Sequence, residues 1–556
     1  MFNVRQFGLL FSLFRERFDQ KLAELNALDS AVGDGDHGFT MARTMRAAET
    51  ASRAEFPDLG AGFDAVADAM AENAGGAIGP LMAALFAEGG IVFADKKEAG
   101  LEEFYSFLKG GLQAVQDVGN AQPGDKTLVD ALSPAVKVLS ENKYKSLAEG
   151  IKAAAEAARI GTEETRQMAA AQGRASFAAD RSIGHQDAGA TSLTILLRTF
   201  HDFFIGARAS AAGEEENGIY SPPPGKLINH PDDMIREDNQ GLAYLYQDLV
   251  RLTPDNILVR AQQKEPGKVA LVIGHGGGHT PSMGGFVGPG LLDADVYGPV
   301  YTCASGISIA RAIHAGERGG GVVLLVSNHS GDVLNARLAV RRTRQDGIQI
   351  EPVILGDDIA TAPREKIQDR RGLGGLLFAL KIGGGAAEAG KSLSEVAELM
   401  RKTNLRTATL SVAVKPPTHP ATGELLFELP PGQIEIGTGV HGEVGVYRGA
   451  HLSANEIIDM LLDRLLDDLK LYHPDSVLIF INGAGGTSKM ELHILYRRAY
   501  QQLGARGIEV AAGVADSYFT TQEMGGFSLS LCAVDQELLT YWKMPASGPS
   551  FHWPYQ

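Results

Sequence analysis

Two patterns of hydrophobic and polar positions divide the chain into two halves. Up to about residue 205, apolar residues recur at spacings of three and four, as in LEEFYSFLKGGLQAVQDV (101–118) and YKSLAEGIKAAAEAARIGTEETRQMAAAQ (144–172). These segments are rich in Ala, Leu, Glu and Lys, which favour helices, and few β-branched runs interrupt them. The pattern predicts an all-α N-terminal region, folded as a helical barrel or bundle.

Beyond the first half, short β-branched runs end in loops of Gly and polar residues. Examples are KVALVIGHGGGH (268–279), GVVLLVSNHSGD (321–332) and SVLIFINGAGG (476–486). Helical stretches alternate with them, such as SANEIIDMLLDRLLDDLK, where Ser453 and Glu456 have the spacing of a capping box. Strand, loop and helix in alternation predict an α/β region with a mainly parallel sheet. Ligands of such sheets bind at the carboxyl ends of the strands, where these loops lie.

The segment ARASAAGEEENGIYSPPPGK (207–226) separates the two patterns. It combines small residues, a run of three Glu and three consecutive Pro, a composition typical of a linker. We therefore expect an all-α domain at 1–205 and a linker at 206–225. Two α/β subdomains should follow at 226–400 and 401–556.

Length, composition and charge narrow the class of protein. A chain of 556 residues is too long for one core, and 44% hydrophobic with 21% charged residues is ordinary for a globular protein. The formal net charge of −16 argues against a nucleic-acid partner, which would require a basic surface. The two cysteines cannot build a disulfide framework, and no apolar run is long enough for a membrane span. We expect a cytoplasmic protein without nucleic-acid or membrane partners.

The stretch LDSAVGDGDHG (28–38) places Asp29, Asp34 and Asp36 within eight residues. Like charges this close repel one another unless a cation lies among them, and carboxylate oxygens are the ligands of hard divalent ions. The alternative is a solvated acidic turn that caps a helix. Neither EF-hand frame places Glu at its twelfth position, which favours magnesium with phosphate over calcium.

Two glycine motifs match nucleotide-binding patterns by letter only. GAAEAGKS (385–392) fits the P-loop, but its interior favours a helix, which Gly390 ends, and Ser392 with Glu395 would cap the next one. GTGVHGEV (437–444) fits G-x-G-x-x-G, but no helix pattern follows it and no protein-kinase motifs lie downstream. We expect that neither motif forms the phosphate-binding loop that its letters suggest.

Taken together, the motifs resemble the single-chain, ATP-dependent dihydroxyacetone kinases over nearly the whole chain. The helical half resembles their nucleotide-binding part and the α/β half their ketose-binding part. The nucleotide part comes first here, whereas the commoner arrangement places it last. The resemblance implies ATP as co-substrate and two Mg²⁺ ions, held by Asp29, Asp34 and Asp36.

Four stretches of the helical half carry the resemblance: LDSAVGDGDHG, GGAIGPL (75–81), PGDKTLVDAL (123–132) and GRASFAADRSIGHQDAGATS (173–192). Ile78 departs from the hydroxyl residue that the family often has in the second stretch. The resemblance implies that the nucleotide is bound by His37, Thr40, Gly75, Gly76, Ile78, Gly79, Thr127, Leu128, Gly173, Arg174, Asp187 and Gly189.

Three loops of the α/β half carry the rest of the resemblance. GHGGGHTP (274–281) resembles a G-G-G-S-G-H-E-P loop, VSNHSGDVLN (326–335) a loop with a catalytic Asp, and EIGTGVHGEVG (435–445) a loop with a reactive His. The resemblance implies catalytic roles for His279, Asp332 and His441, and ketose contacts from Gly276, Gly277, Gly278 and Ser327. Gly277, Thr280 and Ser327 depart from the family's Ser, Glu and Lys, and His275 and His329 add imidazoles.

The resemblance also implies a mechanism. His441 would add to the ketose carbonyl as a hemiaminal, which selects ketones over alcohols by reactivity. His279 would orient the substrate, and Asp332 would take the proton of the terminal hydroxyl that receives the γ-phosphoryl group. The ketose would be dihydroxyacetone or a four-carbon ketose such as erythrulose, with neither favoured. A homodimer is implied, in which each nucleotide domain serves the partner's ketose domain.

Other functions stay open at this point. The chain could be a phosphotransferase-fed subunit with tightly held ADP, although fusion of both halves favours exchangeable ATP. It could be a ligand-binding regulator derived from the kinase, although the intact Asp29, Asp332 and His441 count against that. Cleavage of FAD to a cyclic FMN product, a side activity of the family, would use the same metal site.

Overall fold

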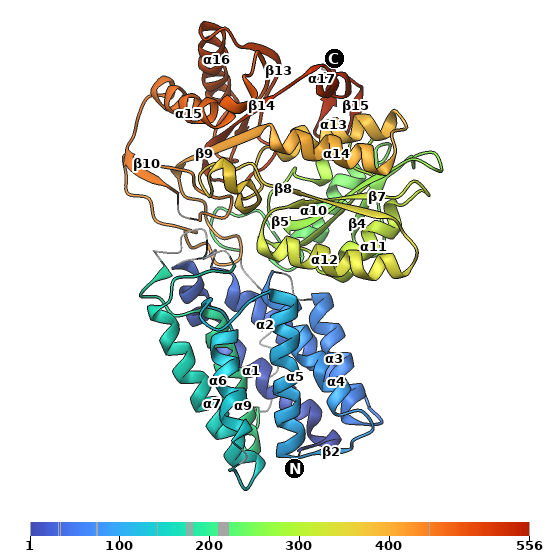
Figure 1. Cartoon of the computed structure of the whole chain (residues 1–556), viewed down its shortest axis with the longest axis vertical. Helices are drawn as coiled ribbons and strands as arrows, with labels where there is room; N and C mark the ends of the chain where they lie inside the picture. Colours follow the sequence, from blue (N-terminus) through green and yellow to red (C-terminus); the bar gives the residue numbers. More distant parts are fainter. Residues whose placement is uncertain are drawn as a thin grey trace. The chain divides into compact units, whose positions relative to one another are not determined.

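The computed structural model describes residues 2–31, 33, 35–73, 76–141, 143–173, 176, 182–209, 222–443 and 445–554. The chain forms two compact units, residues 1–219 and 220–556 (Figure 1). The first unit is helical and the second is α/β, so the predicted fold class is confirmed. Residues 210–221, most of the predicted linker, lie outside the described residues.

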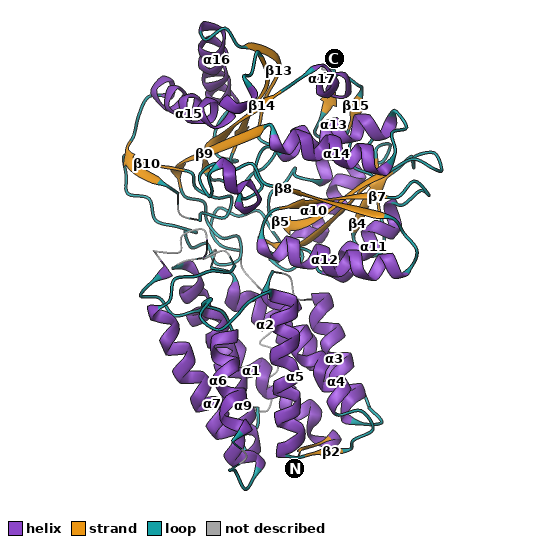
Figure 2. Cartoon of the chain, viewed as in Figure 1, coloured by secondary structure: helices purple, strands orange, loops and turns teal. Residues whose placement is uncertain are grey.

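The helices of the first unit form a closed ring. Each packs against the next described helix in the sequence, and the last returns to the first, as a helical barrel requires. Figure 2 shows this unit as helices with one short strand pair, β1 (Phe2–Asn3) and β2 (Glu98–Ala99). The helices are α1 (Phe7–Ser30), α2 (His37–Ser52), α3 (Leu59–Asn73), α4 (Ile78–Val92), α5 (Leu101–Gly119), α6 (Val129–Ser140), α7 (Leu147–Glu164) and α9 (Ala188–Phe204).

Phenylalanine rings fill the interior of this barrel. Phe86 on α4 lies 5.7 Å from Phe11 on α1 and 6.1 Å from Phe107 on α5, measured between ring centroids. Phe14 and Phe200 join α1 to α9 at 5.0 Å. Tilted and edge-on ring pairs at such distances add to the free energy gained from burying apolar area. The ring of helices is therefore closed by aromatic contacts across its interior.

The first sheet of the α/β unit is mainly parallel, as predicted. Its strand order is β3-β4-β6-β5-β7-β8, and the β6-β5-β7-β8 part is parallel. The strands are β3 (Val250–Leu252), β4 (Ile257–Arg260), β5 (Ala270–Gly277), β6 (Ala294–Val300), β7 (Val322–Ser327) and β8 (Ile350–Leu355). Its helices are α10 (Met234–Leu245), α11 (Gly306–Gly316), α12 (Ser330–Gln345), α13 (Leu376–Glu388) and α14 (Leu393–Leu405).

The second sheet differs from the predicted parallel arrangement. Its strand order is β11-β10-β9-β14-β12-β13, and only β12 and β13 are parallel. The strands are β9 (Thr407–Lys415), β10 (Gln433–Ile436), β11 (Tyr447–Ala450), β12 (Ser476–Gly483), β13 (Glu509–Asp516) and β14 (Gly525–Ala533). The β14 strand enters between β9 and β12 and runs opposite to both. An apolar run indicates a strand buried on both faces but not its direction.

The α/β unit consists of stacked layers. Helices α11 and α12 cover one face of the first sheet, while α13 and α14 cover the other and also contact the second sheet. On the outer face of the second sheet lie α15 (Ala454–Leu469) and α16 (Lys489–Ala505). The chain then ends with α17 (Gln536–Trp542), β15 (Ala546–Ser547) and β16 (His552–Trp553). One hydrophobic cluster therefore contains residues from both sheets, which fixes the loops of the two sheets relative to each other.

Neither glycine motif forms a phosphate loop. Residues 385–388 belong to α13, Gly390 has a φ of +79°, and Ser392 with Glu395 forms the predicted capping box of α14. Strand β11 rather than a helix follows GTGVHGEV. Among the described helices, none combines the length and the hydropathy that a bilayer crossing requires.

Close packing of α6 against α7 yields a first prediction. A Cβ on Gly161 of α7 would lie 2.2 Å from the carbonyl oxygen of Asp130, so Gly161→Ala must separate the two helices. We expect a loss of about 1–3 kcal/mol in local stability, seen as faster amide exchange in α6 and α7. Gly504→Ala in α16 is the control, because a Cβ there meets no atom within 4 Å. Equal exchange in both variants would contradict the assigned packing.

Candidate functional site

Two histidines that are far apart in the sequence meet in the α/β unit. His279 follows β5 and His441 follows β10, and their Nε2 atoms lie 3.1 Å apart. Both side chains are buried. The Nδ1 atom of His279 lies 2.6 Å from the carbonyl oxygen of Thr520. The pair therefore joins loops of both sheets.

The partners of the two rings assign their hydrogen atoms. A carbonyl oxygen only accepts, so Nδ1 of His279 carries a hydrogen. Burial, together with the neighbouring His441, holds the pKa of His279 well below its usual value, so its Nε2 is an acceptor. The hydrogen between the two Nε2 atoms then belongs to His441.

A carboxylate fixes the other side of the His441 ring. Oε1 of Glu443 lies 3.2 Å from Nδ1 of His441, and the backbone N–H of His441 donates to Oε2 at 2.9 Å. Burial alone would raise the pKa of Glu443, but His441 and Arg371 hold it well below its usual range. Glu443 is therefore ionised and accepts a hydrogen bond from Nδ1–H of His441.

Arg371 supports this carboxylate in turn. Its Nη1 atom lies 3.9 Å from Oε2 of Glu443, and its Nε and Nη2 atoms donate to one oxygen of Asp358 at 3.0 and 2.7 Å. All three side chains are buried. Alternating charges in a row keep each buried ion next to one of opposite sign. We refer to Asp358, Arg371, Glu443, His441 and His279 as the histidine relay.

Asp332 lies on the first turn of α12 and is buried. His329, three residues earlier, is the N-cap residue of that helix, and its ring centroid is 6.0 Å from that of His441. The start of α12 therefore lies beside the histidine pair. Ser327, at the end of β7, donates to the carbonyl oxygen of Gly372 at 3.4 Å, and Nε2 of His329 lies 3.2 Å from the same oxygen.

The glycines after β5 allow a close approach of the neighbouring chain. A Cβ on Gly276 would lie 3.2 Å from the backbone of Tyr301 and Thr302, and one on Gly278 would lie 3.0 Å from the Tyr301 ring. Gly277 accepts a hydrogen bond from the backbone N–H of Tyr301 at 2.9 Å. The glycines thus place the Tyr301 ring 5.5 Å from each ring of the histidine pair.

The loops around the histidine pair also place His419, Thr280 and His275. His419 lies 6.0 Å from the Tyr301 ring, and burial with the nearby Lys226 lowers its pKa to about 4. Thr280 donates to Asp238 of α10 at 2.6 Å. His275 is 3.1 Å from the fully buried Asp295. The surroundings of the histidine pair are therefore rich in aromatic and imidazole rings.

In the helical unit, the acidic loop connects α1 to α2. Oδ2 of Asp29 accepts from the backbone N–H groups of Gly35 and Asp36 at 2.8 and 3.1 Å, and Asp36 is the N-cap residue of α2. No Lys or Arg of the described chain pairs with Asp29. Asp34 lies outside the described residues.

A hard divalent cation fits this loop by its chemistry. Gly33 and Gly35 are the residues that let the loop fold back toward Asp29, since a Cβ on Gly33 would collide with that carboxylate. Two carboxylates are thereby held on one short loop. Within the ranges described, no group of three His, Cys, Asp or Glu side chains is arranged as a metal site. The three-carboxylate set includes Asp34 and stays a prediction.

His37 and Thr40 lie on the first turn of α2. Nε2 of His37 is 2.8 Å from the hydroxyl oxygen of Ser192 on α9, and burial lowers the pKa of His37 although Asp29 opposes the shift. Thr40 is buried, and its hydroxyl accepts from Arg43 at 3.5 Å. His37 therefore joins the acidic loop to α9.

The loop before α6 meets the start of α9 near the acidic loop. A Cβ on Gly189 would lie 3.6 Å from the backbone nitrogen of Leu128, and Thr127 donates its backbone N–H to Asp130 at 2.7 Å. Asp187 caps α9, and burial raises its pKa to about 7, with Asp130 and Asp29 adding to the shift. The structure thus brings together Asp29, His37, Thr127, Leu128, Asp187 and Gly189 from three predicted stretches.

Lys126 is a site residue that sequence reasoning did not single out. Its ammonium group donates to the carbonyl oxygens of Thr165, Met168, Ser182 and His185 at 2.5–3.2 Å. The side chain is buried, and burial lowers its pKa. Lys126 therefore fixes both ends of the 165–185 segment against the loop before α6.

The other residues predicted to contact the nucleotide belong to the GGAIGPL stretch and to the start of GRASFAADRSIGHQDAGATS. Ile78 begins α4 and is buried, followed by Gly79, while Gly76 and Gly173 have φ angles of +70° and +71°. Gly75 and Arg174 lie outside the described residues. The interactions of these residues with a nucleotide stay predictions.

Models of known protein families match both units of the chain. The Dak1 domain model matches residues 240–550, more than half of the chain, and the DAK2 domain model matches residues 31–202. The helical unit and the α/β unit each contain one match. These matches, with the kinases named below, make the chain a phosphotransferase of the kinase type. It belongs to the dihydroxyacetone kinase family.

Named relatives match the α/β unit. The dihydroxyacetone-binding subunit DhaK of a PTS-dependent dihydroxyacetone kinase from Listeria innocua is 35% identical over 312 residues, which cover 56% of this chain and 95% of that one. The L-erythrulose kinase of Pectobacterium atrosepticum is 35% identical over 329 residues, 58% of this chain and 56% of that kinase. The matched region thus spans about half of that relative.

Solved structures are also similar to this chain. The dihydroxyacetone kinase of C. freundii, in complex with AMP-PNP and Mg²⁺, gives a TM-score of 0.54 at 28% identity and covers 59% of this chain and 60% of that one. The dihydroxyacetone kinase operon co-activator DhaQ gives 0.54 at 27% identity, covering 58% and 98%. An enzyme and a co-activator therefore share the fold of the α/β unit.

The contacts of Lys126 give the second prediction. Lys126→Met keeps the length of the side chain but leaves buried carbonyl oxygens without their donor, at a cost of about 1–3 kcal/mol. We expect faster amide exchange in 165–185, measured by mass spectrometry. Lys137→Met on the exposed face of α6 is the matched control. Unchanged exchange in Lys126→Met would show that the ammonium group does not hold this segment.

Proposed function

We propose that the protein transfers the γ-phosphoryl group of ATP to the terminal hydroxyl of a short-chain ketose held covalently on His441. The observation that carries the proposal is the buried contact of His441 with His279 on one side and Glu443 on the other. Relatives named as dihydroxyacetone and erythrulose kinases support the substrate class. The structure titled with AMP-PNP and Mg²⁺ supports ATP with Mg²⁺.

The first chemical step would be addition to the carbonyl. His279 takes the proton from Nε2 of His441, and the freed electron pair forms a bond to the carbonyl carbon. The carbonyl electron pair moves to oxygen, which takes the proton back from His279. The hemiaminal retains one positive charge on the His441 ring. Glu443 faces this charge at Nδ1, so its carboxylate would stabilise the adduct.

The second step would be phosphoryl transfer. Asp332 accepts the proton of the terminal hydroxyl while that oxygen bonds to the γ-phosphorus and the bond to the ADP oxygen breaks. Two Mg²⁺ ions, held by Asp29, Asp34 and Asp36, would neutralise charge on the transferring group. The backbone amides of Gly75–Gly79 would donate hydrogen bonds to the oxygens of the same group. The proposed assembly is a homodimer in which each helical unit serves the partner's α/β unit.

The pocket side chains bear on the choice of ketose. Ser327 provides a short hydroxyl where the family has Lys, which removes a fixed positive charge at the end of β7. A four-carbon ketose needs room for one more carbon and a partner for one more hydroxyl. Erythrulose and dihydroxyacetone are both proposed substrates, and relatives named for D- and L-erythrulose match the chain equally well.

The third prediction tests the reaction itself. Purified protein with Mg·ATP should release ADP with dihydroxyacetone, D-erythrulose or L-erythrulose, and not with glycerol, since an alcohol has no carbonyl. His441→Ala should abolish release, and Asp332→Asn should lower kcat about 10²–10⁴-fold. His451→Ala, an exposed histidine, is the control. Release with glycerol, or full activity of His441→Ala, would contradict the hemiaminal.

The fourth prediction concerns Glu443 as a positioning residue. Glu443→Gln removes the charge that faces Nδ1 of His441, so kcat/KM for the ketose should fall about a hundredfold or more, with partial recovery in Glu443→Asp.

Glu435→Gln is the matched control. Glu435 is a buried carboxylate on β10, just before the same loop, and it contacts Gly445 and Arg448 instead of His441. A larger loss in Glu435→Gln than in Glu443→Gln would show that loop stability, and not the charge at Nδ1, controls the activity. The pH profile of kcat/KM separates the two further, because only Glu443→Gln should displace it.

A further inference from the structure

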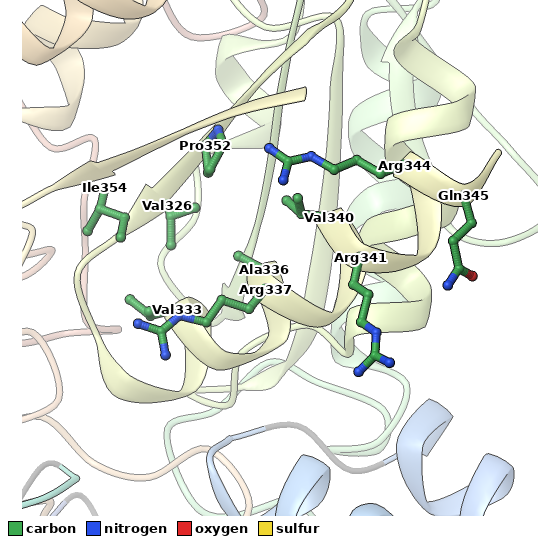
Figure 3. Close-up of a pocket in the computed structure, with 10 residues that line it drawn as sticks. All are labelled: Val326, Val333, Ala336, Arg337, Val340, Arg341, Arg344, Gln345, Pro352 and Ile354. Atoms are coloured by element: carbon green, nitrogen blue, oxygen red, sulfur yellow. The ribbon is translucent and has the colours of Figure 1, made fainter. Parts of the chain in front are cut away.

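An open groove lies between α12 and the edge strand β8 (Figure 3). It encloses about 580 Å³. Its floor is aliphatic and consists of Val326, Val333, Ala336, Val340, Pro352 and Ile354. Ile354 is 44% exposed, Val333 and Pro352 are half-buried, and the other three are buried. The uncovered apolar surface of the floor is therefore at Val333, Pro352 and Ile354.

Arginines form the rim of the groove. Arg337, Arg341 and Arg344 follow one another at spacings of four and three on α12, so they share one side of the helix. In Figure 3, Arg344 extends over Val340 toward Pro352, Arg337 ends beside that floor, and Arg341 points away from it. No carboxylate lines the groove.

This positive rim stands in a chain whose net charge is −16. Among the residues whose positions are described, no Asp or Glu pairs with Arg337 or Arg341. Arg344 gives one N–H to the carbonyl oxygen of Ile350 at 3.1 Å and keeps its other donors for the groove. A guanidinium group favours carboxylate and phosphate partners.

An added β-strand does not fit this edge. The Ile350 carbonyl accepts from Arg344, the Pro352 carbonyl accepts from Arg401 at 3.3 Å, and proline has no N–H to offer. Pairing of a strand with β8 would require these backbone groups. The groove is therefore shaped for side-chain recognition of a small molecule, and its volume lies in the usual range for one.

We propose that this groove binds an amphipathic anion, namely an aliphatic chain that ends in a carboxylate or a phosphate. The chain would cover Val333, Pro352 and Ile354, and the head group would accept hydrogen bonds from Arg337 and Arg344. Neither the ketose chemistry nor the acidic loop uses this surface. Binding can be measured without turnover, so the proposal stands or falls independently of the kinase reaction.

Calorimetry on the full-length protein tests the ligand chemistry. The probes are decanoate, decyl phosphate, decanol, decylamine and inorganic phosphate, each below the concentration at which micelles form. We expect decanoate or decyl phosphate to bind at one site per chain, and the better of the two identifies the head group. Octanoate or octyl phosphate should bind about fourfold more weakly. Each lacks two methylenes, and in an open groove about half of the surface of each methylene would be buried. Equal binding of decanol, or binding of inorganic phosphate alone, would overturn the proposal.

Variants test the place of binding. Arg337→Gln should weaken binding about fivefold, as expected for a partly exposed ion pair, and Ile354→Ser should weaken it through loss of floor area. Arg342→Gln is the matched control, because Arg342 lies on the same helix, is exposed and does not line the groove. Equal effects of Arg337→Gln and Arg342→Gln would overturn the site. The proposal would also be overturned if no anion bound and Ile354→Ser changed the sedimentation coefficient. The surface would then be an interface with a second copy of the chain.

Discussion

The α/β unit depends on how it accommodates buried charge at Glu443. A carboxylate removed from water is costly unless a positive group pairs with it, and Glu443 has two: the His441 ring and Arg371. Arg371 in turn requires Asp358, whose carboxylate it contacts through two nitrogens. Removing Arg371 would leave the Asp358 carboxylate without its positive partner and Glu443 without one of its two. The histidine relay therefore adds a directional constraint on the loops around it, which hydrophobic contacts do not supply.

This constraint explains why the two sheets form one compact unit. Asp358 follows β8 and His279 follows β5, both in the first sheet, while Glu443 and Thr520 come from loops of the second. The Nε2 atoms of the histidine pair stay 3.1 Å apart only if the sheets keep a fixed relation. Helices α13 and α14 supply that relation, since their side chains pack against both sheets. The shared hydrophobic layer thus positions the reactive pair.

Sequence patterns predicted the helices and strands better than they predicted which distant residues contact one another. The capping boxes at Ser392 and Ser453 and the helix at 101–119 are confirmed, because caps and helical periodicity are local. The direction of β14 was not predictable, since a strand buried on both faces reads the same either way. Resemblance gave His279 and His441, but Arg371 lies 72 residues from Glu443 and the Thr520 carbonyl belongs to the backbone. Neither contact leaves a local signal in the sequence.

In the proposed reaction, selection of a ketose over a polyol would follow from the same geometry. Glycerol and dihydroxyacetone differ little in size, so a pocket that recognises shape discriminates weakly between them. An imidazole nitrogen whose proton can pass to His279 reacts with a carbonyl carbon and has no reaction with an alcohol. The lowered pKa of His279 is what makes it able to take the hydrogen bond from His441 in the resting state. Discrimination would then reside in the histidine pair, and the side chains around it, such as Ser327 and His329, are free to differ among ketoses of different length.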